Sequence, residues 1–116
     1  MIDPLYRGDT WELEFQILDH EGKPVDLTGY EIRAEISNEK HSIKKANSKV
    51  PGGSDDEIKV DNQGNIKIIV TKEETAQLKE GSYNFEIEIT SPQGVRTTVV
   101  KDTITVRKDL ITWESK

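Results

Sequence analysis

Cysteine is absent from this chain of 116 residues, and histidine occurs only twice. Without cysteine the fold has no disulfide, no thiolate zinc site and no cysteine nucleophile. It therefore does not depend on an oxidising compartment, which is consistent with folding in a cytoplasm. His20 and His41 lie in separate polar segments without the spacing of metal ligands, so neither a zinc site nor an acid–base histidine is expected. We predict no catalytic residue, no metal ligand and no cofactor.

Long apolar runs are absent as well. Residues 1–7 lack a basic region followed by an apolar stretch, and no run approaches the length that spans a bilayer. We therefore expect neither a signal peptide nor a membrane partner. The net charge of −6 repels a phosphate backbone, which argues against nucleic acid as a partner. The one basic cluster, at 40–45, is followed by acidic residues at 55–57 and is interpreted as part of a solvated loop.

Alternation of apolar and polar residues is the main pattern that is present. Trp11, Leu13, Phe15 and Ile17 share one face of the segment 11–17, which is typical of a half-buried strand. Near Lys101 and Asp102 the parity of the apolar residues changes, which predicts a β-bulge. Further strands are predicted at 30–36, 65–70, 82–90 and 95–106, with short ones near 42–46 and 57–60.

About seven short strands, one short helical turn near 72–79 and no long helix predict an all-β fold. The architecture we expect is an antiparallel immunoglobulin-like β-sandwich, with a closed barrel as the alternative. Residues 1–116 are expected to form a single domain. Turn-forming and charged residues predict an exposed, mobile loop at about 38–56, and a short tail follows at 107–116.

The segment 71–90 changes its period halfway, from a helical turn to a strand. Thr71 and Glu74 have the spacing of a capping box, and Gly81 is expected to end the helix in the left-handed conformation. Tyr83 then has the position of a tyrosine corner, in which the ring enters the core and the hydroxyl binds backbone a few residues upstream. The alternative is an ordinary edge tyrosine after a connecting helix.

Phe85 comes two residues after this tyrosine, where antibody domains carry a disulfide cysteine. We expect its ring to fill the space of that disulfide. Its partner on the strand across the core is then a residue such as Phe15 or Ile17.

Three other motifs are given a structural interpretation. Arg7-Gly-Asp9 is the integrin-binding tripeptide, but here it precedes a strand as a turn. The acidic segments 55–57 and 61–65 lack the EF-hand order, so we interpret them as solubilising turns, with a weak calcium site as the alternative. Carboxylates at positions 12, 14, 86 and 88 lie on outward strand faces, which favours surface charge over a glycosidase pair.

A series of turn and strand motifs follows one order along most of the chain. It begins with Arg7-Gly-Asp-Thr10 and Asp19-His-Glu-Gly-Lys-Pro-Val-Asp-Leu-Thr-Gly-Tyr30. It continues with Thr71-x-x-x-Thr75-Ala76-x-Leu78, Gly81-x-Tyr83-x-Phe85-x-Ile87, Ser91-Pro-Gln-Gly94 and Thr103-Ile-Thr-Val106. In this order and spacing the chain resembles small immunoglobulin-like domains of tailed-phage and prophage structural proteins, such as the N-terminal domain of siphophage baseplate upper proteins. The loop at 38–56 lies outside the resemblance.

The resemblance implies a non-enzymatic tail or baseplate protein, located in the virion after folding in the bacterial host cytoplasm. Its partners would be copies of itself, in a closed symmetric oligomer, or another phage tail protein. The residues we predict for partner contact are Lys44, Lys45, Leu110, Ile111 and Trp113. The alternative function is a carbohydrate-binding or adhesion module, for which Tyr6, Tyr30 and Trp113 are the only aromatic residues left free. An enzyme is the third reading, and no pattern of residues favours it.

Overall fold

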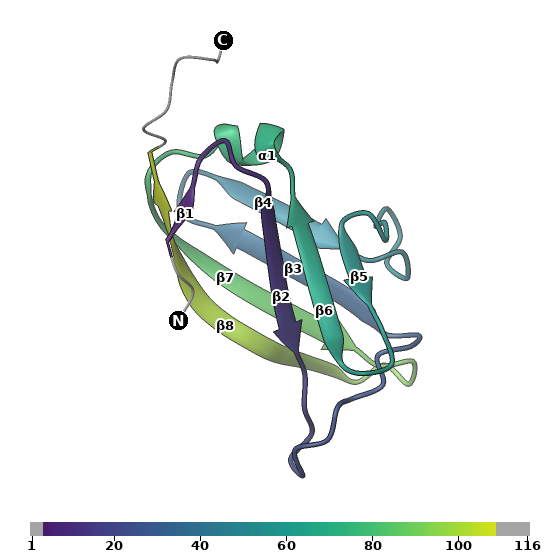
Figure 1. The fold of residues 1–116 in the computed structure, drawn as a ribbon. Coiled ribbons are helices and arrows are strands. Elements are labelled where there is room, and N and C mark those ends of the chain that lie inside the picture. Colours follow the sequence, from purple (N-terminus) through teal and green to yellow (C-terminus); the bar gives the residue numbers. More distant parts are fainter. Residues whose placement is uncertain (1–3, 109–116) are drawn as a thin grey trace.

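The computed structural model describes residues 4–108, which form two packed β-sheets and one short helix (Figure 1). The strands are β1 (Leu5–Tyr6), β2 (Trp11–Gln16), β3 (Glu31–Ser37), β4 (Ser42–Ala46), β5 (Ile58–Val60), β6 (Asn65–Val70), β7 (Gly81–Thr90) and β8 (Arg96–Arg107). The helix α1 (Lys72–Ala76) joins β6 to β7. The predicted tail residues Leu110, Ile111 and Trp113 lie outside the described residues.

The strand order identifies the predicted immunoglobulin-like sandwich. One sheet has the order β1-β8-β7-β3-β4 and the other the order β2-β6-β5. In the immunoglobulin fold strands B, E and D share one sheet while C, F and G share the other. Here β2, β6 and β5 correspond to the first set, and β3, β7 and β8 to the second. The pairs are antiparallel except for β1, which runs parallel to β8.

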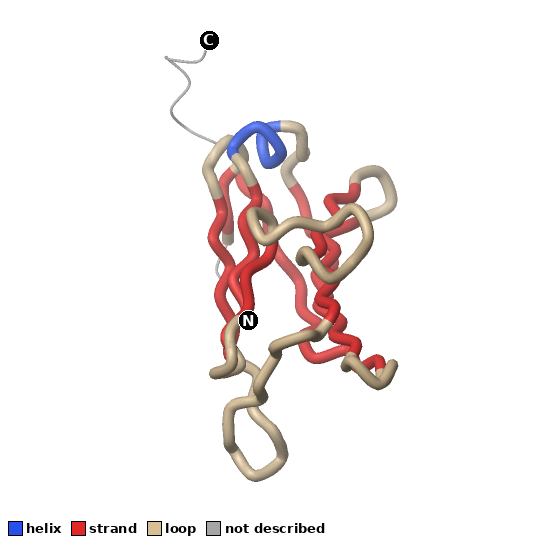
Figure 2. The backbone as a smooth tube through the Cα atoms, turned by 90° about the vertical axis from the view of Figure 1, so that its right-hand side faces the viewer, coloured by secondary structure: helices blue, strands red, loops and turns tan. Residues whose placement is uncertain are grey.

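The core lies between the two inner sheet faces, as the alternation in the sequence predicts. Trp11 and Leu13 of β2 are buried, and so are Ile32, Ala34 and Ile36 of β3 and Tyr83, Phe85, Ile87 and Ile89 of β7. Phe15 is only partly buried, at the margin of this cluster. Figure 2 shows α1 at one end of the strands and the long connection between β2 and β3 at the other.

The helix is shorter than the predicted turn at 72–79, and Gly81 does not end it. Helix α1 stops at Ala76, and its C-cap Gln77 keeps a right-handed conformation. The N–H of Leu78 donates to the carbonyl of Thr75 at 3.1 Å, which tightens the last turn and points Leu78 into the core. Gly81 begins β7 with a φ of 142°, a conformation in which glycine is favoured.

The loop predicted at 38–56 is exposed at most of its positions, but it also contains strand β4, where the sequence predicts a short strand, and a few buried residues. Strand β4 occupies 42–46, and Asn47 and Val50 are buried. The turn-forming residues fold the chain back on itself, since the N–H of Val50 donates to Asn47 O and that of Gly53 to Val50 O. At Gly53 a β-carbon would lie 2.0 Å from the Asn47 carbonyl oxygen, so only glycine allows this approach.

The bulge in β8 lies slightly earlier than predicted. Ile87 pairs with Val100 and Glu88 with Thr98, so Val99 is the extra residue. The predicted position, Lys101 and Asp102, is regularly paired. The position of the bulge was predicted from the residue at which the apolar side chains change from odd to even numbers. Val99 and Val100 are both half buried, so the alternation does not show which of them is the extra residue.

Candidate interaction surface

The end of the sandwich around α1 is tied to the core by Tyr83. Its hydroxyl donates to the carbonyl oxygen of Lys79 at 2.7 Å and accepts the N–H of the same residue at 3.1 Å. This is the backbone contact of a tyrosine corner. In the core, the rings of Phe85 and Phe15 stack with centroids 5.6 Å apart, across the space that a disulfide occupies in antibody domains.

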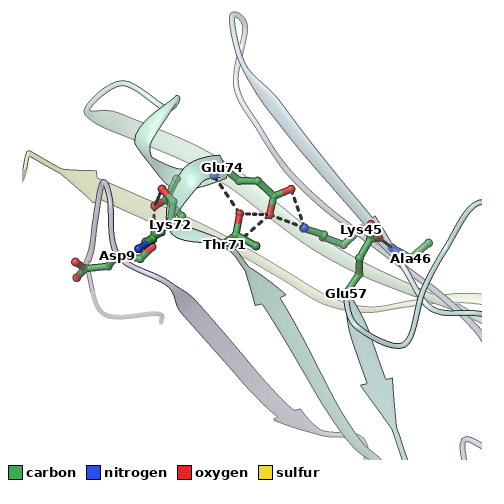
Figure 3. A network of polar contacts seen from close by, with 8 residues as sticks. Asp9, Lys45, Ala46, Glu57, Thr71, Lys72 and Glu74 are labelled. Carbon is green, nitrogen blue, oxygen red and sulfur yellow. Dashed lines mark hydrogen bonds and ion pairs between the residues drawn. The ribbon is translucent and has the colours of Figure 1, made fainter. Parts of the chain in front are cut away.

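A polar network fixes the start of α1 (Figure 3). The hydroxyl of Thr71 accepts the N–H of Glu74, and the Glu74 carboxylate accepts the N–H of Thr71, which completes the capping box. The Lys45 ammonium donates to both Glu74 carboxylate oxygens, at 2.6 and 2.8 Å. Burial acts to raise the pKa of Glu74, but the Lys45 and Thr71 hydrogen bonds and the Lys45 charge hold that pKa below its ordinary value.

Lys45 is therefore not the exposed partner-contact residue that the sequence predicts. Its side chain is 6% exposed, because β4 turns it toward the inside of the sandwich and its ammonium reaches the helix. Lys44, its neighbour, points to solvent on the outer face of the sheet.

The tripeptide Arg7-Gly8-Asp9 packs against the same end of the molecule. The Arg7 guanidinium donates to the carbonyl oxygen of Ala76, the last residue of α1, and to that of Leu78, two residues further on. The N–H of Gly8 donates to the Thr75 hydroxyl at 2.9 Å, and that hydroxyl donates to the carbonyl of Asp9 at 2.7 Å. These contacts give the motif a structural role in holding the helix.

The carboxylate in the acidic turn before β6 also finds its hydrogen-bond donors within the turn. The carboxylate of Asp61 accepts hydrogen bonds from the N–H groups of Gln63 and Asn65 and from the Asn65 side chain. These bonds, led by the one from the Asn65 side chain, lower the pKa of Asp61. Among residues 4–108 there is no group of three or more histidines and carboxylates placed to hold a metal ion.

The outer face of the five-stranded sheet carries an ordered array of exposed charges. One row across four strands consists of Lys44, Glu35, Glu86 and Lys101, each opposite the next in the strand register. We call it the central charged row. In the adjacent rows, Arg33 pairs with Glu31 at 2.9 Å, and Arg96 pairs with Glu88 at 3.5 Å.

The central charged row crosses two shallow depressions. The larger, of about 500 Å³, is walled on one side by the loop at Pro51 and Gly52 and contains Lys44. The smaller, of about 430 Å³, lies toward β8 and contains Lys101. Glu35 and Glu86 line both, so the face is hollowed on either side of the two carboxylates.

The aromatic residues do not form a row among the described residues. Trp11, Tyr83 and Phe85 are buried in the core. Three aromatic residues were predicted to be available for a carbohydrate. Of these, Tyr6 is 42% exposed, Tyr30 is partly buried, and Trp113 lies outside residues 4–108.

Several residues of these sites were not found from the sequence. Asn47 is buried; its side chain accepts the N–H of Ile32 and donates to the carbonyl of Tyr30, and so braces the start of β3. Arg7 and Thr75 were read only as parts of motifs. The charges of Glu35 and Glu86 were visible on outward strand faces, but their apposition depends on the pairing of β3 with β7, which the sequence does not state.

No family model and no curated protein matches the chain. Among solved structures, a presumed glycoside hydrolase from Bacteroides vulgatus is similar over 93% of this chain, with a TM-score of 0.49 and 15% identity. The chain spans 17% of that protein. A structure of murine CRIg is similar over 90% of this chain and 88% of its own, with a TM-score of 0.38 and 13% identity. Because these similarities are so distant, the fold is assigned from the strand order of the chain itself. Among residues 4–108, no helix is long and apolar enough to cross a membrane.

Proposed function

We propose that the chain is a non-enzymatic structural protein of a tailed-phage or prophage particle, and that it assembles with copies of itself through the outer face of the five-stranded sheet. The observation that carries the assembly is the central charged row, with its order of positive, negative, negative and positive side chains. The resemblance of the motifs along the sequence supports the setting in a tail or baseplate.

The row is complementary to itself. A twofold axis that runs parallel to the strands, between β7 and β8, places Glu86 of one copy opposite Lys101 of the other, and the reverse. The neighbouring pair, Asn84 and Thr103, meets in the same way and joins two polar groups. A twofold contact of this kind uses one surface patch on both subunits, so that each favourable contact occurs twice.

The end of the central charged row at β7 and β8 is better suited to a partner than its other end at β4. The loop at Pro51 and Gly52 rises beside Lys44 and limits a flat approach there. Like charges directly opposite each other destabilise a sheet, and Glu35 and Glu86 are such a pair. A lysine of a second copy beside Glu86 relieves that repulsion.

The fold agrees with the proposed setting. A sandwich without disulfides folds in the reducing cytoplasm of a bacterial host and joins the virion afterwards. The polar groups that the sequence singles out, in Arg7-Gly8-Asp9, in Asp61 and in Glu74, are engaged in contacts within the fold.

A charge-swap series tests the contact by sedimentation velocity. Glu86→Lys is expected to weaken self-association, because it places two lysines together on each side of the axis. The double variant Glu86→Lys with Lys101→Glu restores opposite charges across the axis and is expected to restore association. Glu39→Lys makes the same charge change in the exposed turn before β4 and serves as the control. Association that survives Glu86→Lys, or that the double variant fails to restore, contradicts the proposed contact.

A further inference from the structure

The two sheets have four edge strands, and they differ in how far they are protected. Strand β1 has two residues and β5 three, which leaves little backbone to pair. At β4 the loop covers part of the edge, since the N–H of Ala46 donates to a Glu57 carboxylate oxygen and its carbonyl accepts the N–H of Ser54. Lys45 adds an inward-pointing charge to β4, another device that discourages pairing.

Strand β2 has none of these protections. It has six residues, no proline, and three apolar side chains on its inner face. Within residues 4–108 it pairs with β6 on one side, and no strand pairs with its other side. In the immunoglobulin fold this side is where strand A joins the sheet of B, E and D. Here β1 pairs with β8 in the opposite sheet instead.

The hydrogen-bond pattern shows which peptide groups face this open side. The N–H of Ile17 donates to the Gly64 carbonyl, toward the β6 side, whereas Asn65 O and Ile69 N bond toward β5. Peptide groups alternate in direction along an antiparallel ladder. Trp11, Leu13 and Phe15 therefore bond to β6. The N–H and C=O groups of Glu12, Glu14 and Gln16 point away from β6, along the open edge.

The side chains beside this edge define what would fit it. Glu12 and Glu14 are exposed on the outer face of β2, and Lys67, the lysine that pairs with Glu12 at 3.3 Å, lies on the β6 side. A second copy of β2 would bring glutamates opposite glutamates, which destabilises a strand pair. On the inner face, partly buried Phe15 offers an apolar neighbour.

We propose that the open edge of β2 binds an extended segment of a partner protein that carries basic residues at alternate positions and apolar residues between them. The backbone of the segment pairs with Glu12, Glu14 and Gln16, and its basic side chains lie opposite the two glutamates. This is strand addition, in which main-chain hydrogen bonds supply affinity and alternate side chains supply specificity. The contact is separate from the central charged row and goes beyond the assembly proposed above.

The test uses a synthetic peptide of alternating lysine and valine, matched to the six residues of β2, with binding measured by calorimetry. Glu14→Pro removes one outward N–H that β6 does not use, a substitution that edge strands tolerate. Glu14→Ala removes the same charge and keeps the N–H, so it is the matched control. We expect Glu14→Pro to weaken binding at least roughly tenfold and Glu14→Ala on the order of threefold.

Two further measurements keep the test decisive. A peptide N-methylated at its β2-facing nitrogens should not bind wild-type protein, which tests the backbone ladder even if Glu14→Pro unfolds. Amide exchange at Glu12, Glu14 and Gln16 should slow when the lysine–valine peptide binds, and that at Glu88 should not. Equal binding by Glu14→Pro and Glu14→Ala in folded protein, binding of the methylated peptide, or no binding at all overturns the proposal. Glu86→Lys is expected to leave peptide affinity unchanged, so the two proposed contacts can fail separately.

Discussion

The hydroxyl of Tyr83 offers a direct test of how the two sheets are held at the α1 end. Tyr83→Phe keeps the buried ring and removes only the oxygen that bonds Lys79 at 2.7 and 3.1 Å. A typical internal hydrogen bond contributes about 0.5–1.5 kcal/mol, and a buried group left without a partner costs about 1–3 kcal/mol. Both Lys79 backbone groups lose this partner, but water reaches part of the site. We therefore expect the free energy of unfolding to fall by about 2 kcal/mol.

Chemical denaturation at neutral pH measures this change, with thermal unfolding as a second assay. For a domain of this size about 2 kcal/mol corresponds to a fall in Tm of roughly 8 °C. Tyr6→Phe removes a hydroxyl from a side chain that is 42% exposed and is the control, with an expected change within about 0.5 kcal/mol. If Tyr83→Phe costs no more than Tyr6→Phe, the tyrosine does not stabilise the corner through its hydroxyl.

Three further predictions concern the same end of the molecule and the core beneath it. Glu74→Gln should destabilise at pH 7 by about 1 kcal/mol, a value reduced for the exposure of the carboxylate. Because the folded-state pKa of Glu74 lies below its ordinary value of 4.5, this difference from wild type is complete above that pH. This difference in the free energy of unfolding shrinks as the pH falls through the folded-state pKa of Glu74. Urea unfolding over a range of acidic pH measures it. A difference that persists unchanged in acid contradicts the role of the Lys45–Glu74 pair. Arg7→Ala should lower the free energy of unfolding by about 1–2 kcal/mol, and Arg7→Lys should recover only part of this loss, since one ammonium does not reproduce the planar guanidinium fork. If Arg7→Lys recovers all of the stability in thermal unfolding, the contact of Arg7 with two carbonyl groups is contradicted. Phe85→Ala should cost about 3–5 kcal/mol and Phe15→Ala less, because only the first ring is fully buried; the reverse order in denaturant unfolding contradicts the packing described.

The sequence was sufficient for the parts of the fold that local chemistry determines. Alternation identified the strands and their buried faces, because a strand with one buried face repeats every two residues. The corner at Tyr83 also followed from short-range spacing. The stacking of Phe85 on Phe15 was expected from the position of the disulfide in antibody domains, with Ile17 as the other partner considered.

The remainder depended on contacts between distant segments. Val50 and Asn47 are buried in a segment whose composition is that of a loop, because the chain folds back over β4. Lys45 looked like an exposed cation, and only the approach of α1 supplies the carboxylate that keeps it inside. The central charged row and the open edge of β2 both arise from strand pairing, which a single sequence does not specify. The tail residues Leu110, Ile111 and Trp113 stay predictions.

The mass of the wild-type protein in solution tests the central claim, which is self-assembly through the charged sheet face. Light scattering behind a sizing column, over a wide range of concentration, gives this mass directly. A twofold contact predicts a species of twice the 13.2 kDa chain mass at high concentration, which dissociates as added salt screens the Glu86–Lys101 pairs. A mass of 13.2 kDa at every concentration and at low salt contradicts the account.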